Sequence, residues 1–313
     1  MTYKISIPTF VFFGFGMALA AIVLFVSQLF FPYALSSYFF ALNGHLKDPD
    51  IVVVALDDAT INSASFKRYQ DISRCDYATL LKNLLNSEPK AIGVDVFFSS
   101  ASKDAGCDDE LSGLLQKNPN IFVGSEYNEK TKEIIPLFNG KKNLETIGLV
   151  NIHGYHLAGA FAEEFLGIAH KTDTRNSLLL YSFGKNINVL PISLSLYQYA
   201  MGIPSVDISQ NEVAFAGKNA FPHSDGRLFI NFFSSNYPEI SFIDVISNRF
   251  DPEFFRGKTV FVGATSHDIH DEFYTPYDTR NFMPGVVIHA NAYNSLTAQK
   301  PILPIPFWMQ MLL

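Results

Sequence analysis

Acidic and histidine side chains follow three apolar runs that are typical of buried strands. The runs are IVVVAL, AIGVDVFF and TVFVGA, and the acidic and histidine residues within or just beyond them are Asp57, Asp58, Asp95, His267, Asp268 and Asp271. The carboxyl ends of parallel strands share one edge of a sheet, so we expect these groups to meet in a crevice there. Carboxylates and imidazoles so placed can hold a divalent cation, bind a cationic ligand or act as acid and base.

A structural role competes with these chemical roles. Carboxylates also cap helices and loops and pair with arginine, and such networks are common. Arg74 and Arg280 are the candidate partners. The pair His267 and His270 has no third metal ligand at a fixed spacing, which favours an ordinary surface loop. LDDAT is similar to the nucleophile loop of aspartate-dependent phosphatases, but Ala59 stands where the second acid is needed.

Common catalytic and nucleotide-binding motifs are absent from the sequence. It contains no Gly-x-Ser-x-Gly, no P-loop and no Gly-x-Gly-x-x-Gly. These motifs position nucleophiles and phosphates. The sequence therefore predicts no cofactor.

The hydrophobic pattern predicts an α/β fold with a mixed, largely parallel sheet flanked by helices. Between the first two strands, Asp76 is the expected N-cap of a helix with leucines on one face. A strand–helix–strand order joins parallel strands. The other expected elements are a helix from Asp108, strands at 121–127, 147–152 and 177–183, a hairpin within 128–142, a helix after Pro191, antiparallel strands at 206–215 and 227–233, a short helix at 240–247, a strand at 259–264 and a helix at 286–296.

Residues 10–31 form a long apolar segment near the amino end. These 22 residues carry no formal charge. A helix of this length spans about 33 Å, enough for a bilayer core of roughly 30 Å. We expect a transmembrane helix, with residues 1–9 in the cytoplasm because Lys4 precedes the segment. A cleaved signal peptide would need a shorter apolar core and a stronger cleavage site than residues 34–36.

The chain beyond this segment is acidic. It holds all 30 acidic residues and 22 of the 23 basic ones, a net charge of −8. Nucleic-acid binding needs a basic face, so no nucleic-acid partner is expected. In an oxidising compartment Cys75 and Cys107 can form a disulfide, and two unbonded thiols are the alternative.

Residues 301–313, PILPIPFWMQMLL, are again apolar. Only seven residues follow Pro306, too few to cross a bilayer. We expect them to be the start of a second, truncated transmembrane segment, and a segment packed on the surface is the alternative. No linker rich in Pro, Gly or Ser divides residues 47–300, so we treat them as one domain.

Four blocks of the sequence resemble the type-two CHASE family of extracellular sensory domains. The first is DIVVVALDDAT, the second is Arg74 after the next loop, and the third is KAIGVDVFF with the family's Gly-x-Asp at Gly93 and Asp95. The fourth block is the most specific, and its matching positions are Gly257, Lys258, Gly263, Asp271, Thr275, Pro276, Pro284, Gly285, His289, Ala290 and Asn291. The sequence departs from the family at residues 171–176, where an Asp-Gly turn is usual.

The resemblance implies an architecture and a function class. It implies an amino-terminal membrane helix, an extracytoplasmic sensor over residues 47–300, further membrane helices, and a cytoplasmic output domain that is a nucleotide cyclase, a diguanylate cyclase or a kinase. Such outputs usually work in pairs, so a homodimer is expected. The family's ligands are largely undefined, and the resemblance assigns no catalytic residue.

Three hypotheses follow. The leading one is a non-enzymatic input domain of a bacterial receptor, held in the inner membrane and facing the periplasm, that takes an unknown small-molecule or ionic signal. The alternative is a membrane-anchored, metal-dependent hydrolase that uses Asp57, Asp95, Asp271 and His267. A third is a scaffold without a ligand, which acts through its dimer surface. The ligand-binding candidates for the leading hypothesis are Asp57, Asp58, Arg74, Asp95, His267, Asp268 and Asp271.

Overall fold

The computed structural model describes the chain between Asp50 and Gln299, with gaps. The described residues are 50–66, 68–128, 133–134, 147–150, 152–153, 177–179, 181–183, 187–209, 212–216, 220–222, 227–229, 231–273, 275 and 282–299. All of them belong to one compact unit, made of residues 44–155 and 172–304. The predicted membrane segments and Arg280 lie outside the described residues. Within the described part, no helix has the length and apolar character to cross a membrane.

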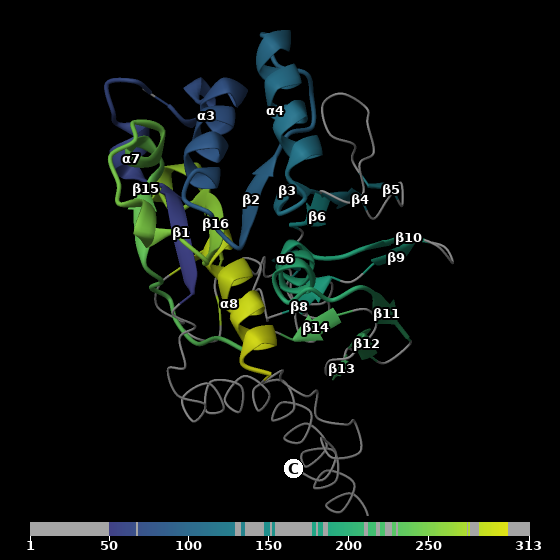
Figure 1. Cartoon of the computed structure of the whole chain (residues 1–313). Coiled ribbons are helices and arrows are strands. Elements are labelled where there is room, and N and C mark those ends of the chain that lie inside the picture. The colour runs from purple at the N-terminus through teal and green to yellow at the C-terminus, as the bar shows by residue number, and fades with distance from the viewer. Residues whose placement is uncertain are drawn as a thin grey trace, which may run out of the picture. The chain divides into compact units, whose positions relative to one another are not determined.

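A six-stranded sheet with the order β15-β1-β16-β2-β3-β6 forms the centre of this unit (Figure 1). Every pairing within it is parallel. The strands are β15 (Glu239–Ser241), β1 (Ile51–Leu56), β16 (Thr259–Ala264), β2 (Ala91–Phe97), β3 (Ile121–Ser125) and β6 (Ile147–Leu149). The largely parallel sheet predicted from the apolar runs is confirmed.

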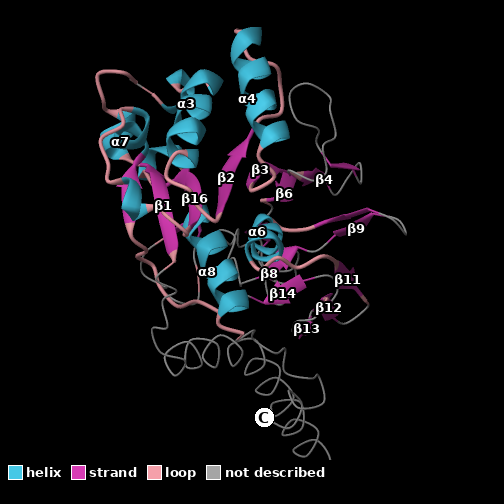
Figure 2. Ribbon diagram, in the orientation of Figure 1, coloured by secondary structure: helices cyan, strands magenta, loops and turns pink. Residues whose placement is uncertain are grey.

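Helices cover both faces of the sheet, as Figure 2 shows. The helices α3 (Arg74–Leu85), α4 (Ala105–Lys117) and α7 (Phe242–Ile246) pack against one face, and α6 (Ile192–Ala200) and α8 (Gly285–Thr297) pack against the other. Because successive strand residues point to opposite faces, a strand covered on both sides is apolar along its whole length. All six residues of β1 and of β16 are buried.

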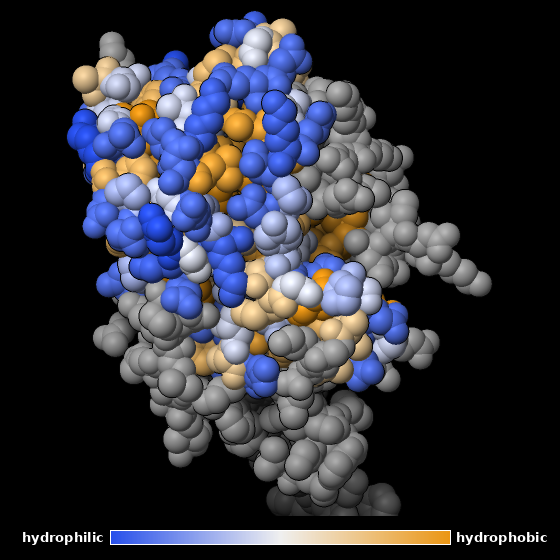
Figure 3. Space-filling model, viewed as in Figure 1, coloured by the Kyte–Doolittle hydropathy of each residue, from blue (hydrophilic) through white to orange (hydrophobic). Residues whose placement is uncertain are grey.

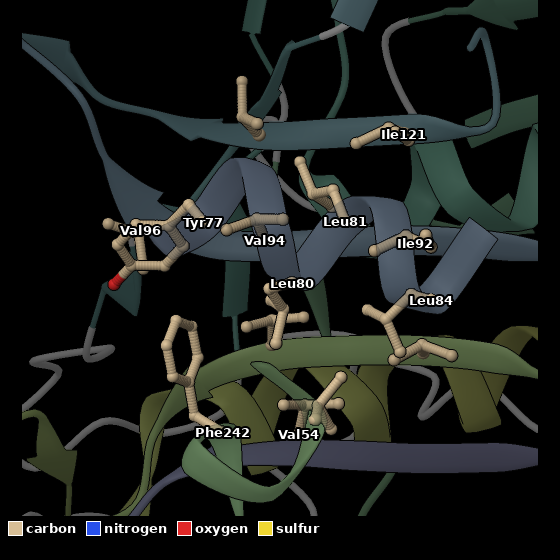
Figure 4. Packing of buried hydrophobic residues seen from close by; sticks show 14 of the residues in the cluster. Val54, Tyr77, Leu80, Leu81, Leu84, Ile92, Val94, Val96, Ile121 and Phe242 are labelled. Atoms are coloured by element: carbon tan, nitrogen blue, oxygen red, sulfur yellow. The ribbon is translucent and has the colours of Figure 1, made fainter. Parts of the chain in front are cut away.

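The main hydrophobic core lies between the sheet and α3. Leu80, Leu81 and Leu84 of α3 are at most 1% exposed. They pack over Val54 and Ile92 of the sheet, as Figure 4 shows. This burial confirms the leucine face predicted for the helix, since residues three and four apart lie on one side of a helix. Figure 3 shows that the outer side of this layer is mostly hydrophilic, with apolar atoms between α3 and α4.

Glycines allow the helices of the other face to lie directly on the sheet. A Cβ atom at Gly148 would lie 2.5 Å from the Ile192 Cα atom of α6, and one at Gly263 would lie 2.7 Å from the Val286 Cβ atom of α8. Neither contact is sterically allowed. The family block that contains Gly263 therefore includes a residue needed for helix–sheet packing.

Two helices begin earlier than the sequence predicted. The N-cap of α3 is Ser73, and Asp76 is its third residue, whose side chain accepts a hydrogen bond from the Ser73 backbone N–H. This reciprocal arrangement is a capping box. Helix α4 begins at Ala105 with Asp104 as its cap, three residues before the predicted start at Asp108. In both cases the prediction chose an acid within the first turn instead of the true cap.

The predicted antiparallel strands fall into smaller sheets. Strands β11 (Val206–Ile208), β12 (Glu212–Phe215) and β13 (Ala220–Pro222) form one antiparallel sheet, but β14 (Arg227–Phe229) pairs with β8 (Ser177–Leu179), not with β12. The other short strands are β4 (Tyr127–Asn128), β5 (Glu133–Ile134), β7 (Ile152–His153), β9 (Tyr181–Phe183), β10 (Ile187–Val189), β17 (Glu272–Phe273) and β18 (Met283–Pro284). The short helices are α2 (Asp58–Ile61), η1 (Tyr69–Asp71), η3 (Pro252–Phe254) and η4 (His267–Ile269).

Candidate functional site

The carboxyl edge of the sheet carries an acidic pocket of about 380 Å³. Its lining residues follow β1 and β16, precede and begin β15, and lie at the start of α8. They are Asp57, Asp58, Ala59, Ser235, Asn236, Glu239, Thr265, Ser266, Pro284 and Val287. Carboxylates and hydroxyls line most of the pocket, and Pro284 and Val287 supply an apolar side. Of the six groups that the sequence predicted to meet at this edge, Asp57 and Asp58 line the pocket, and Asp95, His267, Asp268 and Asp271 do not.

Asp57 of the pocket is already engaged in local structure. Its side chain caps α2, accepting hydrogen bonds from the Thr60 backbone N–H at 2.9 Å and the Thr60 hydroxyl at 2.7 Å. Its second oxygen accepts a hydrogen bond from the Ser241 hydroxyl of β15. With both oxygens used, Asp57 ties the first strand to the edge strand.

Asp58 and Glu239 are the more exposed carboxylates of the pocket. Asp58 accepts a hydrogen bond from the Ser266 hydroxyl at 2.5 Å. Burial and the nearby charge of Asp57 raise the pKa of Glu239. Glu239 lies on β15, a strand that the sequence pattern did not predict because its three residues precede a short helix without a break.

Arg74 lies outside the pocket and has its own partner. Its guanidinium forms an ion pair with Asp108 of α4 and donates a hydrogen bond to the Ser100 carbonyl. Burial raises the pKa of Asp108, but hydrogen bonds from Arg74 and Ser102 outweigh this effect and leave the pKa of Asp108 below its usual value. Through its contacts with Ser100 and Asp108, Arg74 joins α3 to the loop after β2 and to α4. This is the structural role considered for Arg74 from the sequence.

The disulfide lies beside this ion pair. Cys75 of α3 and Cys107 of α4 are joined, with their Cα atoms 4.7 Å apart. Together with Arg74 and Asp108, this bond links the two helices on one face of the sheet. The described residues contain no free cysteine.

The histidines of the loop after β16 do not line the pocket. His267, Asp268 and His270 are exposed. His267 pairs with Glu272, and the centroids of the His267 and His270 rings lie 6.0 Å apart. His270 ends the short helix η4 in a left-handed conformation with φ of 60°. This placement agrees with the surface-loop interpretation of the two histidines.

Asp95, Asp271 and His289 form a second cluster against α8, in which His289 is fully buried and Asp271 is half-buried. The Asp95 side chain is 9% exposed and that of His289 is fully buried, with the Nε2 of His289 3.9 Å from an Oδ2 of Asp95. The β17–β18 hairpin returns the chain so that the Gly285 backbone N–H donates to the Asp271 carbonyl at 2.9 Å. The Asp271 carboxylate lies so close to Gly285 that a Cβ there would be 2.9 Å from its Oδ2.

The protonation of this cluster is set by its burial. Burial raises the pKa of Asp95 to about 7. Burial also raises the pKa of Asp271 to about 7, with the charge of Asp95 adding to the effect and His289 opposing it. Burial lowers the pKa of His289 to about 4, against the opposing influence of Asp271 and the Val150 carbonyl. Groups with such shifted pKa values are frequent in functional sites.

The sequence arguments from spacing missed His289. It lies in the middle of an apolar helix, where a single histidine gives no motif. The sequence feature that could have indicated His289 is its place among the matching positions of the fourth block of the family resemblance. Glu239 had no such signal.

A preformed metal centre is not found around these acids within the described residues. A metal centre needs at least three His, Cys, Asp or Glu side chains with their ligand atoms close together. Among the described residues, one such group has all its ligand atoms within 4.8 Å of one another, and it consists of Cys75, Asp104 and Cys107. Its two sulfurs are already joined as a disulfide. No three of Asp57, Asp95, Asp271 and His267 meet that condition. The hydrolase alternative depends on those four.

Comparison with known protein families matches the CHASE2 domain over residues 15–313. This match covers nearly the whole chain, so the chain belongs to the CHASE2 family, a family of extracellular sensory domains. The predicted resemblance is confirmed. The same kind of comparison finds no match among curated proteins or among solved structures.

Proposed function

We propose that this chain is the extracytoplasmic input module of a bacterial transmembrane receptor. It receives an external small-molecule or ionic signal and passes it to a cytoplasmic cyclase, diguanylate cyclase or kinase. The observation that carries the proposal is the family match over residues 15–313, which includes both the α/β unit and most of the apolar segment at 10–31. That segment anchors the module in the inner membrane, and the α/β unit faces the periplasm.

Two features of the chain agree with an external module that binds no nucleic acid. The Cys75–Cys107 disulfide suits an oxidising compartment such as the periplasm. The chain carries a formal net charge of −7, which disfavours nucleic-acid partners.

The pocket at the carboxyl edge is where the signal acts in this proposal. Asp57, Asp58 and Glu239 give it a negative field, and its position at strand ends is where α/β proteins bind ligands. In a homodimer, a change at this edge alters the arrangement of the two copies. A ligand shifts that equilibrium only by its difference in affinity for the two arrangements.

The hydrolase alternative has less support. It needs Asp57, Asp95, Asp271 and His267 around one ion, whereas Asp57 caps α2 and His267 pairs with Glu272 on the surface. A sensory family also provides no catalytic residue for this chain.

The location is tested by two alkaline phosphatase fusions, because this enzyme folds only where its disulfides form. We expect an active enzyme when it is fused after Gln299 and an inactive one when it is fused after Ile7. Activity only at Ile7 would contradict the proposal. The receptor part is tested by reading the gene beyond codon 313: an in-frame cyclase or kinase is expected, and an immediate stop codon would contradict it.

A further inference from the structure

The buried pair Asp95 and His289 has hydrogen-bonding atoms without partners. Within the described part of the chain, Asp95 Oδ2 and both ring nitrogens of His289 have no partner at full hydrogen-bond geometry. The Val150 backbone lies close enough to the imidazole to raise the His289 pKa slightly, but it does not satisfy a ring nitrogen. Buried polar atoms are nearly always satisfied, and leaving one unpaired costs free energy. The 3.9 Å between His289 Nε2 and Asp95 Oδ2 is too long for a hydrogen bond, but a small movement closes it.

Charged and titratable groups surround the pair from several elements. His289 comes from α8, Asp271 from the loop before β17, and Glu272 from β17 itself. Tyr69 of η1 interacts electrostatically with Asp95 and Asp271, and Tyr77 of α3 lies behind it. Helix α6 packs Ile192 and Leu196 beside Gly93, two residues before Asp95 in β2. No cation other than a protonated histidine is among these neighbours.

We propose that Asp95, Asp271 and His289 form a buried proton-binding site that makes the domain respond to external pH. The proton is held between the Asp95 carboxyl and the His289 imidazole, and it supplies the hydrogen bond that the pair lacks. Asp271 adds a second carboxyl that competes for protons with the first. This proposal names the signal and therefore rests on the proposed function.

A proton fits this site better than a metal ion does. The ligand atoms of Asp95, Asp271 and His289 do not all lie within 4.8 Å of one another, so they do not form a preassembled metal site. Two buried carboxyls that compete for protons titrate as a coupled pair. The pKa values of about 7 for Asp95 and Asp271 place that titration in the range of environmental pH.

Helix α8 is the element that the proton would move. Gly285 contacts the Asp271 carboxylate and His289 faces Asp95, and these two helix positions are four residues apart, on the same side of the helix. The first turn of the same helix supplies Pro284 and Val287 to the acidic pocket. Loss of both carboxyl protons leaves the negative charges of Asp95 and Asp271 beside the first two turns of the helix, and their repulsion loosens its packing.

The site is tested by carbon NMR of the carboxyl groups in the full 313-residue chain, purified in detergent and titrated from pH 4 to pH 9. We expect two aspartate carboxyls with midpoints near 7, against about 3.9 for an ordinary aspartate. Asp95→Asn removes one of them and moves the other to lower pH. The control Asp207→Asn, an exposed strand residue, removes neither.

The response is tested by hydrogen exchange of α8 at pH 5.5 and pH 8, corrected for the intrinsic rate. We expect exchange in α8 to be several-fold faster at pH 8 in the wild type and in Asp207→Asn, and equal at the two pH values in Asp95→Asn. If all aspartate carboxyls of the wild type titrate with midpoints below pH 5, the proton-binding site is contradicted. This test uses the wild type alone, so it does not require that Asp95→Asn folds. Equal exchange in the wild type would overturn pH sensing. Neither result depends on the phosphatase fusions, which test the location alone.

Discussion

At the scale of single residues, Arg74 and Asp108 form an ion pair that is nearly excluded from solvent. The Arg74 side chain is 10% exposed and that of Asp108 is 12% exposed. Removing one member of a buried ion pair leaves the other charge uncompensated. We expect Arg74→Met to lower the free energy of unfolding by about 3–5 kcal/mol.

Urea unfolding at pH 7 measures this loss. The double variant Arg74→Met/Asp108→Leu removes both charges and should recover a large part of it, because no buried charge then remains unpaired. A double variant no more stable than Arg74→Met would show that the cost comes from lost packing over Phe98, which lies 5.6 Å from the guanidinium carbon.

Asp57 is a pocket residue with a structural role. Asp57→Ala removes the cap of α2 and the contact to Ser241. An N-cap is worth about 1 kcal/mol, and we expect a loss of about 1–2 kcal/mol in urea unfolding. The exposed Asp207→Ala should change the value by less than about 0.5 kcal/mol. Equal values for the two variants would contradict the structural role of Asp57.

The sequence predicted which acids lie at strand ends, but not what they do there. Asp57 directly follows β1, as the apolar run predicted, whereas Asp95 lies inside β2, two residues before its end. Spacing could not show that Ser241 donates a hydrogen bond to Asp57, since that contact depends on the edge strand β15. His289 was beyond spacing arguments because a histidine on a buried helix face resembles its apolar neighbours until the facing strand is known.

At the scale of elements, close packing of α6 on β6 depends on Gly148. A methyl group there would lie 2.5 Å from the Cα atom of Ile192 and must push the helix backbone. We expect Gly148→Ala to destabilise the protein by about 1–3 kcal/mol. The matched control is Gly113→Ala in α4, where an added Cβ meets nothing within 4 Å.

The control should act in the opposite direction. An alanine in a helix interior is favoured over glycine by about 1 kcal/mol, so Gly113→Ala should stabilise the protein. Thermal unfolding of both variants against the wild type measures the difference. A Gly148→Ala variant as stable as the wild type would mean that α6 does not rest on β6 as described.

The disulfide between α3 and α4 makes a separate prediction at this scale. It closes a loop with a sequence separation of 32 residues. A loop of this length is expected to stabilise the folded state by about 3–4 kcal/mol, mainly through the unfolded chain. The double variant Cys75→Ser/Cys107→Ser should show this loss in urea unfolding, and a reducing agent should lower the stability of the wild type but not that of the variant. A wild type insensitive to the reducing agent would contradict the assignment.

Element types were predicted better than element boundaries. The strands IVVVAL and TVFVGA were placed to the residue because an apolar run buried on both faces ends where the first polar side chain appears. The starts of α3 and α4 were missed because several acids and serines lie within one turn, and only the backbone shows which of them is the cap. Short antiparallel strands were paired wrongly because β14 takes β8, far away in the chain, as its partner.

At the scale of the whole molecule, the buried cluster makes stability depend on pH. Asp95 and Asp271 have pKa values of about 7 in the folded state, against 3.8 for an ordinary aspartate, so their contribution to the free energy of unfolding falls as pH rises through this range. The pKa of His289 is about 4 in the folded state against 6.5 for an ordinary histidine, so its contribution to the free energy of unfolding rises with pH over nearly the same interval. Two carboxyls outweigh one imidazole, and from pH 4.5 to 6.5 the folded state holds one more proton of this cluster than the unfolded state does.

The most direct test is the free energy of unfolding in urea, measured from pH 4.5 to pH 7 for the wild type and for Asp95→Asn. One extra proton corresponds to about 1.4 kcal/mol per pH unit. As pH rises, the wild type should lose stability relative to Asp95→Asn with about that slope, while Asp207→Asn follows the wild type. Parallel curves for the wild type and Asp95→Asn, or a wild type that gains stability relative to the variant as pH rises, would contradict a buried proton site at this edge of the sheet.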